Sequence, residues 1–294
     1  MQKKIAGIYN SNYKHAVGDG FNVVNIFSNG NNLGNRMSPF FMIDYQPEKF
    51  ITPTEKKLGV NVHPHRGIEP VTIVYQGYIA HADGAGHSEV VGPGDIQWMT
   101  AGKGILHKEY LEENFTRQGG KLQMIQFWTI LPTKYKFVVP DYQSIRSNDI
   151  KKAELPNNAG LVRVIAGTYE NVSSQVRTYS PMNVLDVRLH TAGTIKISCP
   201  ENYNMGLLVL TGTVSVNGQQ ADKEQFVLFE NSGTNVAITA TETAQLLILN
   251  GEPLNEPAVH KGPFVMNTEA EIEQAYADAK AGKFGFLKAE KVAV

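Results

Sequence analysis

Two pairs of residues, His63 with His65 and His107 with Glu109, have the types and spacing of metal ligands. One residue separates the members of each pair. On a β-strand, residues i and i+2 point to the same face, about 7 Å apart at a rise of about 3.3 Å per residue. The stretch between the pairs is long enough for several strands to bring them opposite each other. Three imidazoles and one carboxylate would suit a divalent transition metal.

The segment joining the two pairs has the composition of turns and strands. Residues 91–95, VGPGD, have turn chemistry, and residues 97–102 lead toward His107. Trp98 and Met99 are expected to line a cavity near the ion. His81 and His87 fall around a stretch rich in Gly and Asp and are predicted to be loop residues.

The elements that must position these residues are predicted to be short strands. Runs rich in Val, Ile, Thr, Phe and Tyr alternate with widely spread Gly and Pro, which favours an all-β sandwich or barrel. One amphipathic helix is expected near the end of the chain, over 268–282. Its apolar residues recur at helical spacing, Thr268 and Glu271 form a capping-box pattern, and Gly282 suits the helix end.

The chain of 294 residues suggests two domains, predicted as residues 1–140 and 160–294 with a polar linker at 141–159. The second domain is expected to carry the tail helix. The sequence VYQG at 74–77 resembles VLTG at 209–212, which indicates duplicated β-barrels. Aligning their glycines places Ser198 and Pro200 at the positions of the first histidine pair, so the second barrel is expected to be metal-free.

Composition excludes several classes of protein. Hydrophobic residues make up 42% and charged residues 19%, as in a folded globular chain. Lys and Arg number 27 against 28 Asp and Glu, so direct nucleic-acid binding is not expected. The one cysteine, Cys199, excludes an internal disulfide and a cysteine-based zinc cluster. No apolar run is long enough to span a membrane and no signal peptide is visible, so a cytoplasmic monomer is expected.

Three segments together resemble the pirin family of the cupin superfamily: HPHRGIEPV, PGDIQWMTAGKGILHKE and GEPLNEPAVHKGPFVMNT. The resemblance covers most of the chain. It implies a bicupin, with two antiparallel jelly-roll β-barrels and a C-terminal helix. It also implies one iron, most simply Fe(II) with other divalent metals as alternatives, held in the first barrel. The family's ligand positions fall on His63, His65, His107 and Glu109.

A second carboxylate competes for the fourth ligand position. Generic cupins have a Glu four residues after the second histidine, and Glu69 stands there. If the strand continued unbroken, Glu69 would share the parity of His63 and His65. We favour Glu109, because the pirin pattern matches fully and Pro70 could disturb the strand near Glu69.

The resemblance implies function less firmly than fold. Some pirins cleave the flavonol quercetin with O₂, so an iron-dependent dioxygenase with a flavonol-like substrate and Glu109 as its base is the first hypothesis. The alternative is a metal- or redox-sensing protein that regulates a protein partner, with Arg66 either a plain surface charge or part of that contact. A third hypothesis is a binding protein with a structural metal.

Overall fold

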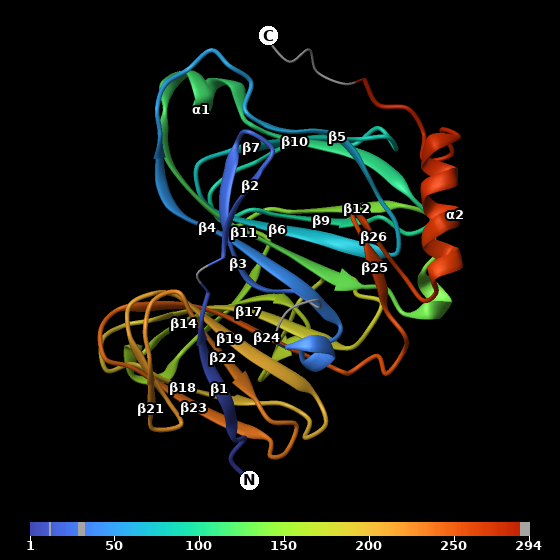
Figure 1. The fold of residues 1–294 in the computed structure, drawn as a ribbon. Coiled ribbons are helices and arrows are strands. Elements are labelled where there is room, and N and C mark those ends of the chain that lie inside the picture. Colours follow the sequence, from blue (N-terminus) through green and yellow to red (C-terminus); the bar gives the residue numbers. More distant parts are fainter. Residues whose placement is uncertain (12, 29–32, 289–294) are drawn as a thin grey trace. The chain divides into compact units, whose positions relative to one another are not determined.

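The computed structural model describes residues 1–11, 13–28 and 33–288, and within this part of the chain almost every element is a β-strand (Figure 1). Two compact units form. The histidine-bearing unit consists of Tyr13–Asn25, Phe41–Ser147 and Asn255–Val294. The apolar unit consists of Met1–Asn12, Ile26–Phe40 and Asn148–Leu254. The predicted all-β class is therefore confirmed.

Each unit contains a seven-stranded and a four-stranded sheet, whose strands pair mostly in antiparallel fashion. The larger sheet of the histidine-bearing unit has the order β12 (Asp141–Ile145), β9 (Ile96–Thr100), β6 (Ile68–Gln76), β11 (Gly120–Ile130), β4 (Phe40–Ile51), β3 (Phe21–Ser28), β2 (Lys14–Val17). Its smaller sheet has the order β5 (Gly59–His65), β10 (Ile105–Leu111), β7 (Ile79–Asp83), β8 (Ser88–Val91).

The apolar unit repeats this plan. Its larger sheet has the order β1 (Ile5–Asn10), β22 (Gln225–Phe229), β19 (Asn204–Thr211), β24 (Ala244–Gly251), β17 (Met182–Leu189), β14 (Gly160–Ala166), β13 (Lys151–Glu154). Its smaller sheet has the order β18 (Thr194–Ser198), β23 (Asn235–Ala240), β20 (Val214–Val216), β21 (Gln219–Ala221). Strands β15 (Thr168–Tyr169) and β16 (Val172–Ser173) form a separate pair.

The interior of the apolar unit is continuous and hydrophobic. Buried Val, Leu, Ile and Phe side chains from both of its sheets form one cluster, which also includes Cys199. The histidine-bearing unit has a smaller apolar cluster, built around Val74, Ile79 and Leu122. In both units the strand at the expected repeat is followed directly by a glycine with a left-handed backbone, Gly77 after β6 and Gly212 after β19.

The helical elements are few in the described residues. They are α1 (Glu113–Gln118), α2 (Glu269–Lys280) and the short 3₁₀ turns η1 (Gly34–Met37), η2 (Thr133–Tyr135) and η3 (Pro156–Asn158). Helix α2 confirms the expected tail helix, because Thr268 and Glu271 form the capping box and Gly282 has a left-handed backbone.

The division of the chain differs from the predicted boundaries. Helix α2 and the hairpin of β25 (Val259–Lys261) and β26 (Phe264–Met266) fall within the histidine-bearing unit. Ile272 and Ala275 pack there against Phe264, in a small cluster of their own. Strand β1 pairs with β22 in the apolar unit. The expected linker at 141–159 contains strands β12 and β13, and the chain passes between units within it.

Candidate metal centre

Strand pairing brings three predicted ligands together in the smaller sheet of the histidine-bearing unit. Strand β10 lies beside β5, with His107 directly opposite His63 and Ile105 opposite His65. The ring centroids are 4.2 Å apart for His63 and His107, and 4.9 Å apart for His65 and His107. One ligand atom from each histidine lies within 4.8 Å of the others. Three imidazoles therefore converge, as the spacing predicted.

Backbone carbonyls orient two of these rings. The register between β5 and β10 shifts between His107 and Glu109, which places a β-bulge around Asn61. The Asn61 carbonyl oxygen lies 2.8 Å from Nδ1 of His63, and the Pro263 carbonyl oxygen lies 3.0 Å from Nδ1 of His65. A ring that donates Nδ1–H to a carbonyl keeps the lone pair of Nε2 free, which is the usual arrangement of a metal-binding histidine.

His107 is the buried centre of this group. It is 1% exposed, and neither of its ring nitrogens has a hydrogen-bond partner within the described chain. Burial, with His63 and His65 nearby, holds the pKa of His107 well below its ordinary value. Burial and the neighbouring His63 lower the pKa of His65 to about 3. Neutral rings with unsatisfied nitrogens suit a divalent cation, which would supply the missing partner.

Glu109 lies on the same strand but is held away from the three-histidine group. Its two carboxylate oxygens accept hydrogen bonds from the side-chain amides of Gln97 and Gln126, the latter at 3.0 Å. One carboxylate oxygen of Glu109 lies within 4.8 Å of a ring nitrogen of His107 and of His81. Among the described residues, no set of three donor atoms within 4.8 Å of one another joins Glu109 to His63 or His65. The structure thus brings Glu109 to one side of His107 and the first histidine pair to another.

His81 is a member of this cluster that the sequence pattern does not reveal. His81 was predicted to be a loop residue, but it lies on β7 opposite Glu109 and is 2% exposed. Its ring centroid is 5.5 Å from that of His107. His87, in contrast, lies in the loop between β7 and β8, as predicted. The alternation of His81 and Asp83 was the available signal, but the glycines that follow masked it.

Glu69 occupies a different environment. The chain turns at Gly67, whose φ is +80°, so β5 and β6 are separate strands in separate sheets and the expected common parity is wrong. The hydroxyls of Thr100 and Thr129 donate to the two oxygens of Glu69 at 2.8 and 3.1 Å. Burial raises the pKa of Glu69 to about 7. Pro70 does not interrupt β6, which continues through it.

The aromatic residue beside the histidines is not the expected one. Trp98 and Met99 are fully buried, and the Trp98 ring packs against Phe127. Their neighbour Gln97 reaches the site instead. The ring of Trp128 lies 5.0 Å from that of His65, edge to face.

Arg66 is not a surface charge. Its side chain is 6% exposed; it donates to Asp278 Oδ2 at 2.8 Å and to the Lys103 carbonyl at 2.6 Å. The pair joins the residue next to His65 to helix α2. The hairpin that precedes α2 carries Pro263, so the C-terminal segment helps to hold His65 in place.

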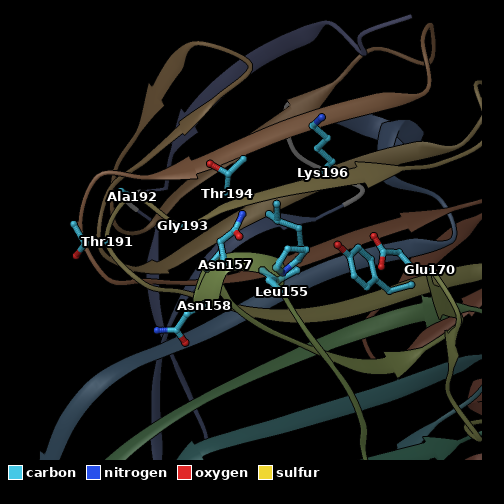
Figure 2. A pocket seen from close by; sticks show the side chains of 13 residues that line it. Leu155, Asn157, Asn158, Glu170, Thr191, Ala192, Gly193, Thr194 and Lys196 are labelled. Atoms are coloured by element: carbon cyan, nitrogen blue, oxygen red, sulfur yellow. The ribbon is translucent and has the colours of Figure 1, made fainter.

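Among its described residues, the apolar unit has no comparable group of metal-binding side chains. Ser198 and Pro200, which the repeat aligned with the first histidine pair, are both exposed, and the interior positions of β18 are Ile195 and Ile197. A cavity of about 610 Å³ lies in this unit. Figure 2 shows Thr194, Lys196 and Glu170 among the residues that line it. Its lining includes no histidine, so its chemistry differs from that of the histidine cluster.

Comparison with known proteins identifies the family. The Pirin family model matches residues 20–129, and the Pirin C-terminal cupin domain model matches residues 184–285. A Pseudomonas aeruginosa protein, named provisionally as a quercetin 2,3-dioxygenase, is 43% identical over 96% of this chain and 98% of its own length. The chain belongs to the pirin family. Human pirin is 35% identical over 79% of this chain and 80% of its own length.

The pirin fold extends over nearly the whole chain. A crystal structure of quercetin 2,3-dioxygenase from Acinetobacter baumannii matches 98% of this chain and 100% of its own, with 40% identity and a TM-score of 0.94. The two units are thus cupin domains, and the predicted bicupin with a C-terminal helix is confirmed. The histidine cluster lies within the matched Pirin region. None of the helices described here is long and apolar enough to cross a membrane.

Proposed function

We propose that this pirin is an Fe(II)-dependent dioxygenase of the quercetinase type, which opens the central ring of flavonols with O₂. The observation that carries the proposal is the buried His107, whose two unsatisfied nitrogens lie among His63, His65 and Glu109. These four residues would hold the ion. Names and structures of relatives support the reaction class, since the matched Acinetobacter baumannii structure is that of a quercetin 2,3-dioxygenase.

The donor set suits an anionic oxygen ligand. Three neutral imidazoles and one carboxylate leave one positive charge on a divalent ion uncompensated. A bound Fe(II) would supply this charge, which favours the ionised form of a flavonol 3-hydroxyl, and would supply an electron to O₂. The protein supplies the neutral rings, because burial lowers the pKa of His65 and of His107.

Glu109 is the candidate base of the reaction. The residue is 5% exposed, and its carboxylate accepts hydrogen bonds from the side-chain amides of Gln97 and Gln126. The two amides fix its orientation without donating a full charge, so the carboxylate retains lone pairs for the 3-hydroxyl proton. The Trp128 ring, which lies 5.0 Å from that of His65 and stacks on Phe41 at 6.3 Å, gives the site an apolar side that would limit the access of water.

Oxygen uptake by the Fe(II)-loaded protein tests this function. Quercetin is expected to support uptake above that of free Fe(II), whereas luteolin, the same flavonoid without the 3-hydroxyl, is expected to support none. Glu109→Gln is expected to keep its iron and lose about 10²–10⁴ of the turnover, as for removal of a general base. The control is Glu273→Gln on the exposed side of α2. If the wild-type protein turns quercetin over no faster than free Fe(II) does, the proposed dioxygenase activity is refuted.

The regulatory alternative has less support in this structure. It relied on Arg66 as a residue available to a partner, and the Arg66 guanidinium is instead engaged by Asp278 and the Lys103 carbonyl. Metal-dependent binding of a protein partner remains the outcome to seek if the dioxygenase assay fails.

A further inference from the structure

His81 is a buried histidine that the proposed four-ligand centre does not use. It lies on β7, the strand on the far side of β10 from β5, opposite Glu109. One ligand atom from each of His81, His107 and Glu109 lies within 4.8 Å of the other two. All three residues are at most 5% exposed. The cluster therefore contains a second group of three donors, which overlaps the three-histidine group at His107.

The carboxylate of Asp83 lies beside the His81 ring and is itself fixed by backbone hydrogen bonds. Asp83 Oδ2 lies 3.5 Å from Nε2 of His81 and 2.8 Å from Nδ1 of His87. The other oxygen, Oδ1, accepts hydrogen bonds from the backbone N–H groups of Ala85 and His87. In the tautomer that donates Nε2–H to Asp83, His81 keeps its lone pair on Nδ1, which is buried and has no partner among the described residues. Carboxylate–histidine pairs of this kind orient metal ligands.

The two groups of donors share His107 and so cannot bind two metal ions independently. A neutral imidazole has one lone pair, so His107 can serve one ion at a time. The pair His63 and His65 is grouped with His107 but not with Glu109, whereas His81 is grouped with both His107 and Glu109. One ion could therefore bind at either of two neighbouring positions. One lies at His63, His65 and His107, which Glu109 would have to approach to complete the four-ligand centre. The other lies at His81, His107 and Glu109.

We propose that His81 is a fifth donor of this centre, and that His81, His107 and Glu109 form a second position for the same divalent transition-metal ion. The inference rests on the metal binding required by the proposed function, but it does not depend on flavonol chemistry. It adds Asp83 as the residue that positions His81.

Cobalt(II) binding in a variant that lacks the first position tests the inference. His65→Ala removes a ligand of the three-histidine group and leaves the second group intact. This variant is expected to bind one Co(II) more weakly than wild type. Adding His81→Gln is expected to weaken the remaining affinity at least tenfold. The matched control adds His87→Gln, because His87 also contacts Asp83 but belongs to neither group, and its affinity is expected to stay within threefold of His65→Ala.

The outcomes separate this inference from the metal centre itself. A wild-type protein that binds no Co(II) would overturn both. Co(II) binding by wild type but none by folded His65→Ala, or equal binding by His65→Ala with and without His81→Gln, would overturn the second position alone. If His65→Ala fails to fold, the inference is tested by the visible absorption of Co(II) bound to the single variants His81→Gln and His87→Gln. His81→Gln is then expected to change the bands and His87→Gln to leave them unchanged, and unchanged bands in both would overturn the inference.

Discussion

The two cupin units use the same pairing of a seven-stranded with a four-stranded sheet, but they fill their interiors differently. At the edge of the smaller sheet, the apolar unit pairs β18 with β23 and buries Ile195, Ile197 and Ile238. The histidine-bearing unit pairs β5 with β10 at the same place and buries His65 and His107. The fold itself therefore needs no polar interior, and the histidines reflect a requirement other than stability.

Polar burial of this kind has a cost in the absence of a ligand. A buried polar atom without a hydrogen bond destabilises a protein by about 1–3 kcal/mol, and His107 has two such nitrogens. In the interior of the apolar unit, by contrast, the burial of most side chains stabilises the folded state, because they are apolar and leave water on folding. Exchanging residue types between the two units should make this difference measurable.

The largest expected effect is the loss of metal binding in His107→Leu. His107 belongs to both groups of donors, so its removal leaves neither position complete. Co(II) or Zn(II) affinity is expected to fall more than about 100-fold, beyond the 10–100-fold typical of changes to outer-shell partners. Isothermal titration against Ile238→Leu, a change in the apolar unit, provides the control. Retained tight binding in His107→Leu would place the metal elsewhere.

The reciprocal exchange, Ile197→His, is expected to destabilise the protein without creating a metal site. Ile197 is 2% exposed and surrounded by aliphatic side chains, so an imidazole there loses apolar burial and has no polar partner. The free energy of unfolding is expected to fall by about 2–5 kcal/mol. Urea unfolding of the metal-free protein measures it, with Ile197→Val as the control at about 1 kcal/mol. Equal losses in both variants would mean that polarity is not the cause.

A smaller, pH-dependent effect is expected for Glu69→Gln. The pKa of Glu69 is raised from 4.5 to about 7, so the folded state holds the proton that the unfolded chain releases. Its contribution to stability is complete below pH 4.5 and is lost as the pH rises through 7. The metal-free variant is expected to gain about 1–3 kcal/mol relative to wild type on going from pH 4.5 to pH 8. A gain that is the same at both pH values would contradict the raised pKa.

The smallest expected effect comes from Asp278→Ala in helix α2. Without its ion pair to Arg66, the C-terminal segment is expected to hold the Pro263 carbonyl less firmly against His65. Co(II) affinity should weaken by about tenfold, the lower end for an outer-shell partner. Lys280→Ala, an exposed change in the same helix, should leave the affinity unchanged. Hydrogen exchange over the β25–β26 hairpin would show whether the loosening occurs there.

Local patterns were sufficient to predict the elements and part of the site. The alternation of His63 with His65 specified one face of a strand, and Thr268 with Glu271 specified where α2 begins. These signals work because they depend on neighbours within a few residues. The sequence alone also placed His107 near the first histidine pair, although the pairing of β5 with β10 had to be assumed.

Long-range pairing and local turns explain what the sequence did not reveal. Glu69 does not face the same side as His63 and His65, because the chain turns at Gly67 between two sheets. The alternation of residue types gives no indication of such a turn. His81 was hidden because the glycines beside it resemble a loop. The burial of Arg66 depends on Asp278, which lies more than two hundred residues away in the chain.

The exchange of segments between the units has a consequence for biosynthesis. Strand β1 is made first, but its partner β22 belongs to the second half of the chain. His65 leaves the ribosome long before Pro263, which follows the last residue of the apolar unit. At about 5–20 residues per second, this interval is on the order of ten seconds or more. A nascent chain would therefore carry its histidines unsupported for that time, and neither half expressed alone would contain a complete domain.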